Sequence, residues 1–146
     1  MKKLLASVVL LAMMITTFAS CDRKVVLTDA NIPEEIKTFA QLHFPNNPII
    51  QVVKEVDDFE VTFDVTLKEG LFLEFNRKKE IIEIDTRNGS VPNSAISPKI
   101  TEYVKTNYPD MQIIQWEMDD RRQKVKISNK MELEFTRNGD FMMIDE

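Results

Sequence analysis

The side chains that carry most enzymatic chemistry are scarce in this sequence, in which His43 is the only histidine and Cys21 the only cysteine. A Ser–His–Asp or Cys–His site needs its histidine beside a nucleophile, whereas His43 directly precedes Phe44 and Pro45 at the expected end of a helix. A zinc site needs several histidine or cysteine ligands. We therefore interpret His43 as a surface or half-buried side chain, and we expect no catalytic histidine, no metal site and no cofactor.

Two acidic pairs, Asp57-Asp58 and Asp119-Asp120, offer oxygen ligands of the kind that a calcium ion prefers. Neither pair has the Asp-x-Asp-x-Asp-Gly spacing of a dedicated calcium loop. Both pairs fall at expected hairpin tips, where aspartate is a common turn residue. We interpret them as solvated turn residues.

Catalytic carboxylates are the remaining enzymatic alternative, because Glu74, Glu83 and Glu134 are expected on one face of a sheet. A hydrolase that used them would need a concave pocket around an acid with a raised pKa. Charged residues on a solvated sheet face need no functional cause, however. The sequence therefore favours a protein that is not an enzyme.

The start of the chain has the pattern of a secretory signal. Two lysines precede an apolar run over residues 4–15, and a run of mostly small residues then ends at Cys21. The segment resembles a bacterial lipoprotein signal, in which the cysteine after the cleavage site is acylated, although Phe18 stands where leucine is commonest. The alternatives are an ordinary signal peptide followed by a free cysteine and, because the apolar run is short, less favourably a transmembrane helix. We predict that residues 1–20 are removed and that Cys21 is acylated.

The mature chain left by this cleavage carries 17 basic and 24 acidic residues, because the removed segment contains two lysines and no acid. A domain with this excess of negative charge has no electrostatic attraction for nucleic acid. Its membrane association is expected to come from the acyl chains on Cys21, at the periplasmic or outer-membrane face of the bacterial cell envelope. Residues 21–31 are predicted to be a tether between this anchor and the folded part.

The remainder of the chain has the pattern of a tandem duplication. Residues 32–51 (IPEEIKTFAQLHFPNNPIIQ) and 96–115 (ISPKITEYVKTNYPDMQIIQ) agree in residue type at a constant offset of 64. The two copies close on matching segments, LEFNRKKEIIEID and LEFTRNGDFMMID, which are offset by 60. The predicted segments are a first repeat, a linker and a second repeat, at residues 32–86, 87–95 and 96–146.

Each copy begins with the signals of a helix and continues with the signals of four strands. Pro33 and Pro98 stand near the first helical position, and apolar residues follow each of them at helical spacing. Residues 59–67 alternate between apolar and polar side chains, as expected for a strand with one buried and one solvated face. We predict an α+β fold of two tandem repeats, each with one helix packed on a four-stranded antiparallel meander, joined in one eight-stranded sheet.

One helix covers one face of each four-stranded meander and leaves the other face open to a partner. Strand alternation predicts that Ile50, Ile114 and Met142 lie on the helix side, and that Ile49 and Ile113 lie on the open face. Apolar side chains among charges on an open sheet face are typical of a binding surface. The residues predicted to contact a partner are Phe72, Ile81, Phe141, Met143, Glu74 and Glu134.

The pattern of the two copies resembles a known family. It runs from Pro-x-x-Ile-x-x-Phe/Tyr through Phe/Tyr-Pro and Ile-Ile to Leu-Glu-Phe-x-Arg and a closing Ile-Asp, over residues 32–145. In this it is similar to the PepSY-like domains of secreted bacterial proteins, whose fold looks like that of beta-lactamase inhibitory protein. The first copy departs from the pattern because it has Lys78-Lys79 where the second has Asn138-Gly139. The resemblance implies binding or inhibition of proteins, and the matching positions determine fold rather than activity.

The resulting hypothesis is a lipid-anchored binding module of the cell envelope, which uses the open face of the sheet to bind an envelope protein or peptide. Inhibition of a protein or a peptidase is one form that this binding could take. The alternatives from other classes are an envelope hydrolase that uses the sheet-face carboxylates and a purely structural envelope protein.

Overall fold

The computed structural model describes residues 23–57, 59–87 and 89–145. The predicted signal peptide, the predicted lipidation site Cys21 and the turn residue Asp58 therefore lie outside the described residues. The described part contains two α-helices, α1 (Glu34–His43) and α2 (Pro98–Asn107). Its strands are β1 (Arg23–Val26), β2 (Ile49–Asp57), β3 (Glu60–Leu67), β4 (Phe72–Phe75), β5 (Ile81–Asp85), β6 (Ile113–Met118), β7 (Arg122–Ile127), β8 (Glu132–Thr136) and β9 (Phe141–Asp145).

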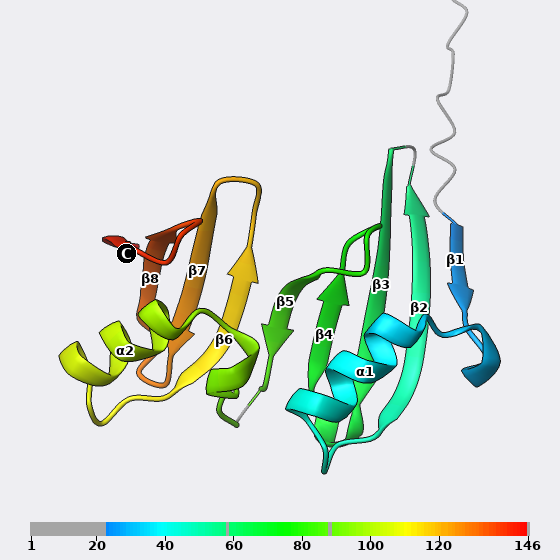
Figure 1. Cartoon of the computed structure of the whole chain (residues 1–146), viewed down its shortest axis with the longest axis horizontal. Helices are drawn as coiled ribbons and strands as arrows, with labels where there is room; N and C mark the ends of the chain where they lie inside the picture. Colours follow the sequence, from blue (N-terminus) through cyan, green and yellow to red (C-terminus); the bar gives the residue numbers. More distant parts are fainter. Residues whose placement is uncertain (1–22, 58, 88, 146) are drawn as a thin grey trace, which may run out of the picture.

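All nine strands form one antiparallel sheet in chain order, with β1 at one edge and β9 at the other. Both helices lie against the same face of this sheet (Figure 1). No helix among the described residues has the length and the apolar character needed to span a membrane.

The prediction of two tandem repeats, each with one helix on a four-stranded meander, is wrong. The structure has a single nine-stranded sheet with two helices. Residues 23–26, which the sequence assigned to the tether, form β1 and pair with β2 from Arg23↔Val56 to Val26↔Val53. β5 and β6 pair directly, so the segment over residues 87–95 connects two neighbouring strands of the one sheet. The α+β class of the prediction holds.

The helices start where the local signals predict. α1 follows Pro33 and carries two glutamates in its first turn, where acids interact favourably with the helix dipole. α2 has Pro98 in its first turn, where the missing N–H of proline costs no helical hydrogen bond. Residues four apart on each helix are buried against the sheet, namely Ile36 and Ala40 on α1 and Ile100 and Val104 on α2.

One apolar core fills the space between the helices and the face of the sheet that they cover. Phe75 of β4 and Phe135 of β8 are fully buried in this core. Each makes an edge-to-face contact with an aromatic ring of the helix beside it, Phe39 and Tyr103 respectively, with ring centroids 5.4 Å apart in both pairs. The helices are thus fixed on the sheet by matching aromatic contacts.

Four register shifts interrupt the simple alternation of the strands, two of them near the starts of β2 and β6. A β-bulge places one extra residue on one strand, so side chains before and after it exchange faces. Ile49 pairs with the buried Leu67, and Ile113 pairs with the buried Ile127. Both therefore face the core, whereas Ile50 is 65% exposed. The predicted faces of these three residues are wrong.

The other two register shifts lie between β4 and β5 and between β8 and β9, and they change the face of the sheet on which Ile81 and Phe141 lie. Ile81 pairs with the buried Phe75 and packs against the core. Phe141 pairs with the buried Phe135 and stacks on Tyr103 of α2, with ring centroids 4.4 Å apart. Both residues lie on the helix side of the sheet, so the prediction that they point away from the helices is wrong.

Candidate functional site

The sheet face that the helices leave open is the candidate functional site. A row of side chains crosses this face from β1 to β9, because each of its residues pairs directly with the next across the strands. The row consists of Val26, Val53, Asp64, Glu74, Glu83, Glu117, Lys124, Glu134 and Met143. Its four consecutive acids, Asp64, Glu74, Glu83 and Glu117, are called the acidic row below. Directly opposed side chains have Cβ atoms about 4.5–5.5 Å apart, so the register places these carboxylates side by side.

The four central strands β3 to β6 hold the acidic row in place. Each acid is flanked along its own strand by apolar residues of the opposite face, as Glu74 is by Leu73 and Phe75, which are fully buried. Rotating a strand to separate the acids would take core side chains into water. The flanking residues that are buried are Phe63, Val65, Leu73, Phe75, Ile84 and Trp116.

The crowding of the acidic row appears in its protonation. Burial first, and then repulsion by Asp64, Glu83 and other acids, raises the pKa of Glu74 from 4.5 to about 7. The pKa of Asp64 rises from 3.8 to about 6, mainly through burial and then through Glu55, while Lys24 lowers it. Burial also raises the pKa of Glu83, against a hydrogen bond that its carboxylate accepts from Gln115. The ionised forms of Asp64, Glu74 and Glu83 are therefore less favourable than those of ordinary exposed acids.

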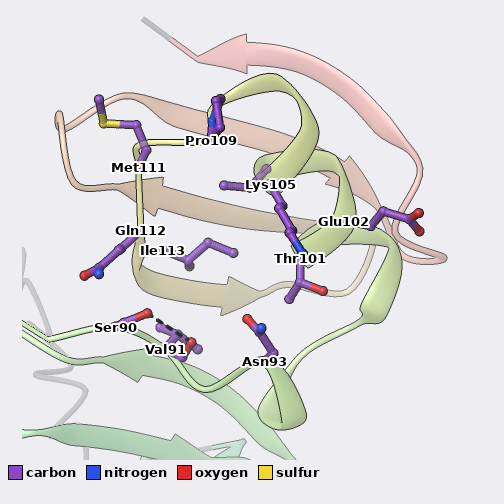
Figure 2. Close-up of a pocket in the computed structure, with 11 residues that line it drawn as sticks. Ser90, Val91, Asn93, Thr101, Glu102, Lys105, Pro109, Met111, Gln112 and Ile113 are labelled. Carbon is purple, nitrogen blue, oxygen red and sulfur yellow. Dashed lines mark hydrogen bonds between the residues drawn. The ribbon is translucent and has the colours of Figure 1, made fainter.

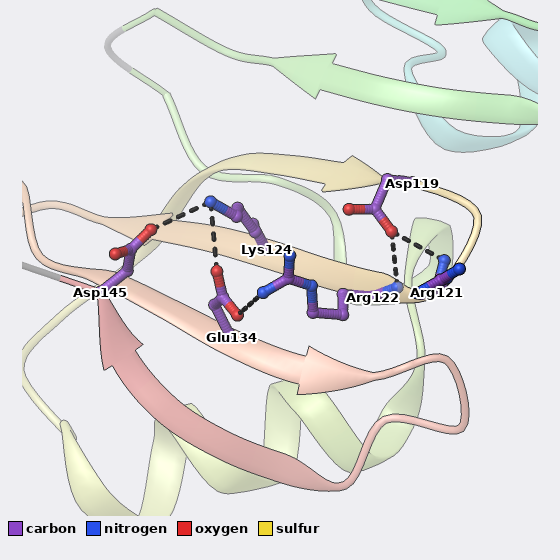
Figure 3. A network of polar contacts seen from close by, with 6 residues as sticks. All are labelled: Asp119, Arg121, Arg122, Lys124, Glu134 and Asp145. Atoms are coloured by element: carbon purple, nitrogen blue, oxygen red, sulfur yellow. Dashed lines mark hydrogen bonds and ion pairs between the residues drawn. The ribbon is translucent and has the colours of Figure 1, made fainter.

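Glu134 belongs to the same row of side chains but has the opposite environment (Figure 3). Its carboxylate, only 4% exposed, accepts from Arg122 Nη1 at 2.6 Å and from Lys124 Nζ at 3.2 Å. Lys124 also contacts Asp145 Oδ2 at 2.9 Å. The β7–β9 part of the open face is thus neutralised by its own side chains. Among the salt bridges between described residues, none involves Asp64, Glu74 or Glu83.

Four of the six predicted partner-binding residues lie on the open face of the sheet, and the other two lie on the helix side. Glu74 and Glu134 lie in the row just described, Phe72 is half-buried opposite Thr66, and Met143 is 51% exposed. Ile81 and Phe141 lie on the helix side, as described above. Because β5 to β8 lie between Phe72 and Met143, the apolar residues that remain form no contiguous patch. The acidic row, rather than an apolar patch, distinguishes this face.

Asp64, Glu83 and Glu117 were missing from the predicted site. Alternation within each strand indicates that Asp64 and Glu83 share the open face, but it does not say which residues stand opposite each other. That information lies in the register between strands, and bulges shift it by one residue. The signal that could have found them is the position of the acids on successive strands, compared between the two strands of each hairpin rather than within one strand.

The residues considered for metal binding have ordinary roles. His43 is half-buried with Nδ1 2.9 Å from Ser94 Oγ, and burial lowers its pKa. Asp119 Oδ1 accepts hydrogen bonds from the backbone N–H groups of Arg121 and Arg122, both at 2.7 Å (Figure 3), and these bonds lower its pKa. Both observations agree with the sequence interpretation. Within the described ranges, no three acids, histidines or cysteines are grouped to hold a metal ion.

Two cavities on the helix side of the molecule contain no catalytic set. One cavity of about 480 Å³ lies beside α2 and is lined by polar groups such as Ser90, Asn93 and Lys105 (Figure 2). Another, of about 510 Å³, lies beside the end of α1 and includes His43. Glu74 lines neither of them. The raised pKa that a hydrolase needs is therefore present at Glu74, but these cavities do not supply the pocket.

Comparison with known proteins places the fold among periplasmic proteins. A "putative calcium-regulated periplasmic protein" from Bacteroides thetaiotaomicron is 29% identical, with a TM-score of 0.79 over 84% of this chain and 97% of that one. Two "putative periplasmic proteins" from Bacteroides vulgatus are each 31% identical: one has a TM-score of 0.80 over 86% of this chain and 99% of its own, the other 0.79 over 85% and 100%. These relatives support a periplasmic or envelope location. Among curated proteins, none matches the chain.

A family model described as "Putative beta-lactamase-inhibitor-like, PepSY-like" matches residues 61–143, which is more than half of the chain. The match begins in β3 and ends in β9, so it includes every residue of the acidic row. Together with the similarity to the periplasmic structures, this match assigns the family. The chain belongs to the PepSY-like family.

Proposed function

We propose that this protein is a binding protein of the bacterial cell envelope, and that the acidic row on its open sheet face binds a positively charged polypeptide. The observation that carries the proposal is the direct pairing of Asp64, Glu74, Glu83 and Glu117 across four strands. Like charges that stand directly opposite each other in a sheet destabilise it. A cation that binds beside the four acids of this row would reduce their mutual repulsion and so stabilise the protein.

The attraction of this surface for a cation is strengthened by partial burial. Glu74 and Glu83 are half-buried, so their charges are less screened by water than those of exposed acids. The neighbouring basic residues of β7 do not relieve the row, because Lys124 and Arg122 are engaged with Glu134 and Asp145. A lysine or arginine side chain from a partner would supply the missing countercharge.

The proposal describes a binding protein rather than an enzyme. A raised pKa such as that of Glu74 is also found in catalytic acids, but catalysis further needs a pocket that holds a substrate. The proposal includes inhibition of the bound partner as one result of binding, and we assign that inhibition to no specific loop. The membrane anchor belongs to the proposal as well: acylation of Cys21 would hold the binding face at the envelope surface.

Calcium is a second candidate ligand of the acidic row. It is favoured by one observation, the description of the Bacteroides thetaiotaomicron relative as calcium-regulated. Carboxylates are suitable calcium ligands, although calcium takes six to eight oxygens in a rounded shell. A straight row on a sheet offers fewer oxygens to one ion, and the described residues contain no group of three ligands arranged for a metal. We therefore place the polypeptide first.

Isothermal titration calorimetry of the predicted mature chain, residues 21–146 with Cys21 replaced by serine, tests both candidate ligands, the cationic polypeptide and calcium. The probes are a tetralysine peptide and calcium chloride. The double variant Glu74→Gln with Glu83→Gln should weaken tetralysine binding by roughly tenfold or more, because it removes two charges from the acidic row. The matched control is Glu132→Gln, whose carboxylate on the same face is already paired with Lys126 at 2.6 Å and should leave binding unchanged.

The outcomes separate the two ligands. One outcome is that calcium binds saturably, that the double variant abolishes this binding, and that tetralysine does not bind. This outcome would identify calcium, rather than a polypeptide, as the ligand of the acidic row. Failure of both probes to bind, or binding that survives the double variant, would overturn the assignment of the acidic row.

A further inference from the structure

The seam between β5 and β6 is the shortest in the sheet. These strands pair through three residue pairs, from Asp85↔Gln115 to Glu83↔Glu117, whereas every other neighbouring pair of strands in the described chain shares at least four. Beyond Glu83 and Glu117, toward the end where β6 finishes, the described residues of the two strands are no longer paired. The sheet therefore has an opening between its two halves at this end.

A cavity of about 480 Å³ occupies the opening, within the usual size range of ligand pockets. We call it the seam notch. Its apolar lining consists of Ile81 and Ile82 from β5 and Met118 from β6, all of them half-buried. Apolar side chains from both separated strands thus form a surface to which another chain could add contacts.

The remaining lining of the seam notch is strongly acidic. Glu60, Glu80, Asp119 and Asp120 contribute four negative charges, and Arg137 contributes the one positive charge among the lining residues. Arg137 donates from Nη1 to the backbone carbonyl of Asp120 at 3.0 Å. The Asp119 carboxylate is held by backbone N–H groups, and Glu80 accepts a hydrogen bond from Asn76 Nδ2 at 2.9 Å. The notch has fixed acids around an apolar lining.

We propose that the seam notch binds an extended segment of a partner polypeptide in which basic and apolar side chains alternate. An extended chain sends successive side chains to opposite sides, so its apolar residues can contact Ile82 and Met118 while its basic residues meet the acids. The occupant is identified by charge complementarity with the rim and by the strand ends that border the cavity. Both strands run directly from the notch into Glu83 and Glu117 of the acidic row.

The inference rests on the proposed function, because it gives the cationic partner of the acidic row a second point of contact. The two sites nevertheless use different residues. Glu80 and Asp120 line the notch and are exposed, and neither belongs to the acidic row. Substitution there separates the notch from the row.

The test is titration of the secreted chain with the hexapeptide Val-Lys-Val-Lys-Val-Lys, with termini blocked, followed by the fluorescence of Trp116, the only tryptophan. Trp116 lies two residues before Met118, and its Nε1 donates to Gln123 at 3.0 Å, so occupation of the notch should shift its emission. The double variant Glu80→Lys with Asp120→Lys should weaken binding at least tenfold, since it reverses two rim charges. The double variant Glu35→Lys with Glu102→Lys, which reverses two exposed acids on helices α1 and α2, is the control for net charge.

The result that supports the notch is loss of hexapeptide binding in the Glu80/Asp120 variant with tetralysine binding at the acidic row retained. Hexapeptide binding that is equally weak in the Glu35/Glu102 control would mean that net charge alone explains the effect, and it would overturn the proposal for the notch. Hexapeptide binding that depends only on Glu74 and Glu83 would also overturn the notch while leaving the acidic row intact. A Glu-for-Lys version of the hexapeptide should not bind, and its binding would contradict the charge argument.

Discussion

Glu74 and Glu134 both stand in a Leu-Glu-Phe segment, and in both segments the leucine and phenylalanine are fully buried. The core therefore turns both carboxylates to the open face in the same way. Their neighbours decide the rest: Asp64 and Glu83 stand beside Glu74, whereas Lys124 and Arg122 neutralise Glu134. The same local sequence thus yields a repelled acid in one place and a paired acid in the other.

Replacing Glu74 with glutamine should stabilise the fold at pH 8. The folded-state pKa of about 7 lies above the ordinary 4.5, so the folded state binds more protons than the unfolded state between these values. The contribution of Glu74 to stability is therefore fully present below pH 4.5 and is lost as the pH rises through 7. After a discount for solvent screening, the gain in the variant should be on the order of 1 kcal/mol. Urea unfolding at pH 5 and pH 8 measures it, and a variant with an unchanged pH dependence would contradict the assignment.

Replacing Glu134 with glutamine should have the opposite effect. The substitution keeps the shape of the side chain but leaves Arg122 and Lys124 without their shared carboxylate. Because both cations are partly exposed and can regain water, a loss of about 1–2 kcal/mol in the free energy of unfolding is expected. Unfolding curves for the two glutamine variants at one pH give the direct comparison.

The elements of this fold were predictable to different extents. Both helices and the four strands after each could be predicted, because proline signals and periodic apolar residues mark them locally. The strand β1 could not, because four residues without long alternation carry no such mark. The bulges could not be located either, since one inserted residue changes the facing of Ile81 and Phe141 without changing the composition around them. Half of the predicted apolar contacts were lost for this single reason.

Phe141 should matter for stability rather than for partner binding. It stacks on Tyr103 at 4.4 Å and meets Phe135 edge-to-face at 5.8 Å, although 38% of it is exposed. Phe141→Ala should therefore cost about 1–2 kcal/mol, less than a fully buried phenylalanine. Met143→Ala is the matched control on the same strand, because Met143 faces away from the helices beside Glu134 and should cost little. Thermal unfolding measures the loss of stability in both variants. Equal losses would contradict the position of Phe141 on the helix side and indicate that it lies on the open face.

The register of the whole molecule is what creates the acidic row, and it connects residues that lie far apart in the chain. Glu83 and Glu117 meet across the seam between β5 and β6, with α2 and its connections between them in sequence. The signals within each strand do not say which residues stand opposite each other across this seam. The candidate site could therefore be predicted only as a face of the sheet, and its charge pattern required the continuous nine-stranded arrangement.

The attachment of the whole molecule to the membrane is a prediction that depends on Cys21. Cys21→Ala should release the protein into the soluble fraction of the envelope, because it removes the predicted site of acylation while keeping the export signal. Fractionation followed by a carbonate wash measures the partition, and wild-type protein is the control. A variant that stays with the membranes after the wash would contradict lipid anchoring.

The order of the strands also has a consequence for how the chain folds. Every strand lies beside its neighbours in sequence, and of the eight connections only those from β1 to β2 and from β5 to β6 contain an α-helix. The other six are hairpins, whose ends meet after short loops and with little loss of chain entropy. Local pairing of this kind favours rapid folding, since each hairpin closes only a short loop. The folding rate should therefore be governed by the two closures that enclose a helix, and the N-terminal strands can assemble before the C-terminal ones have been made.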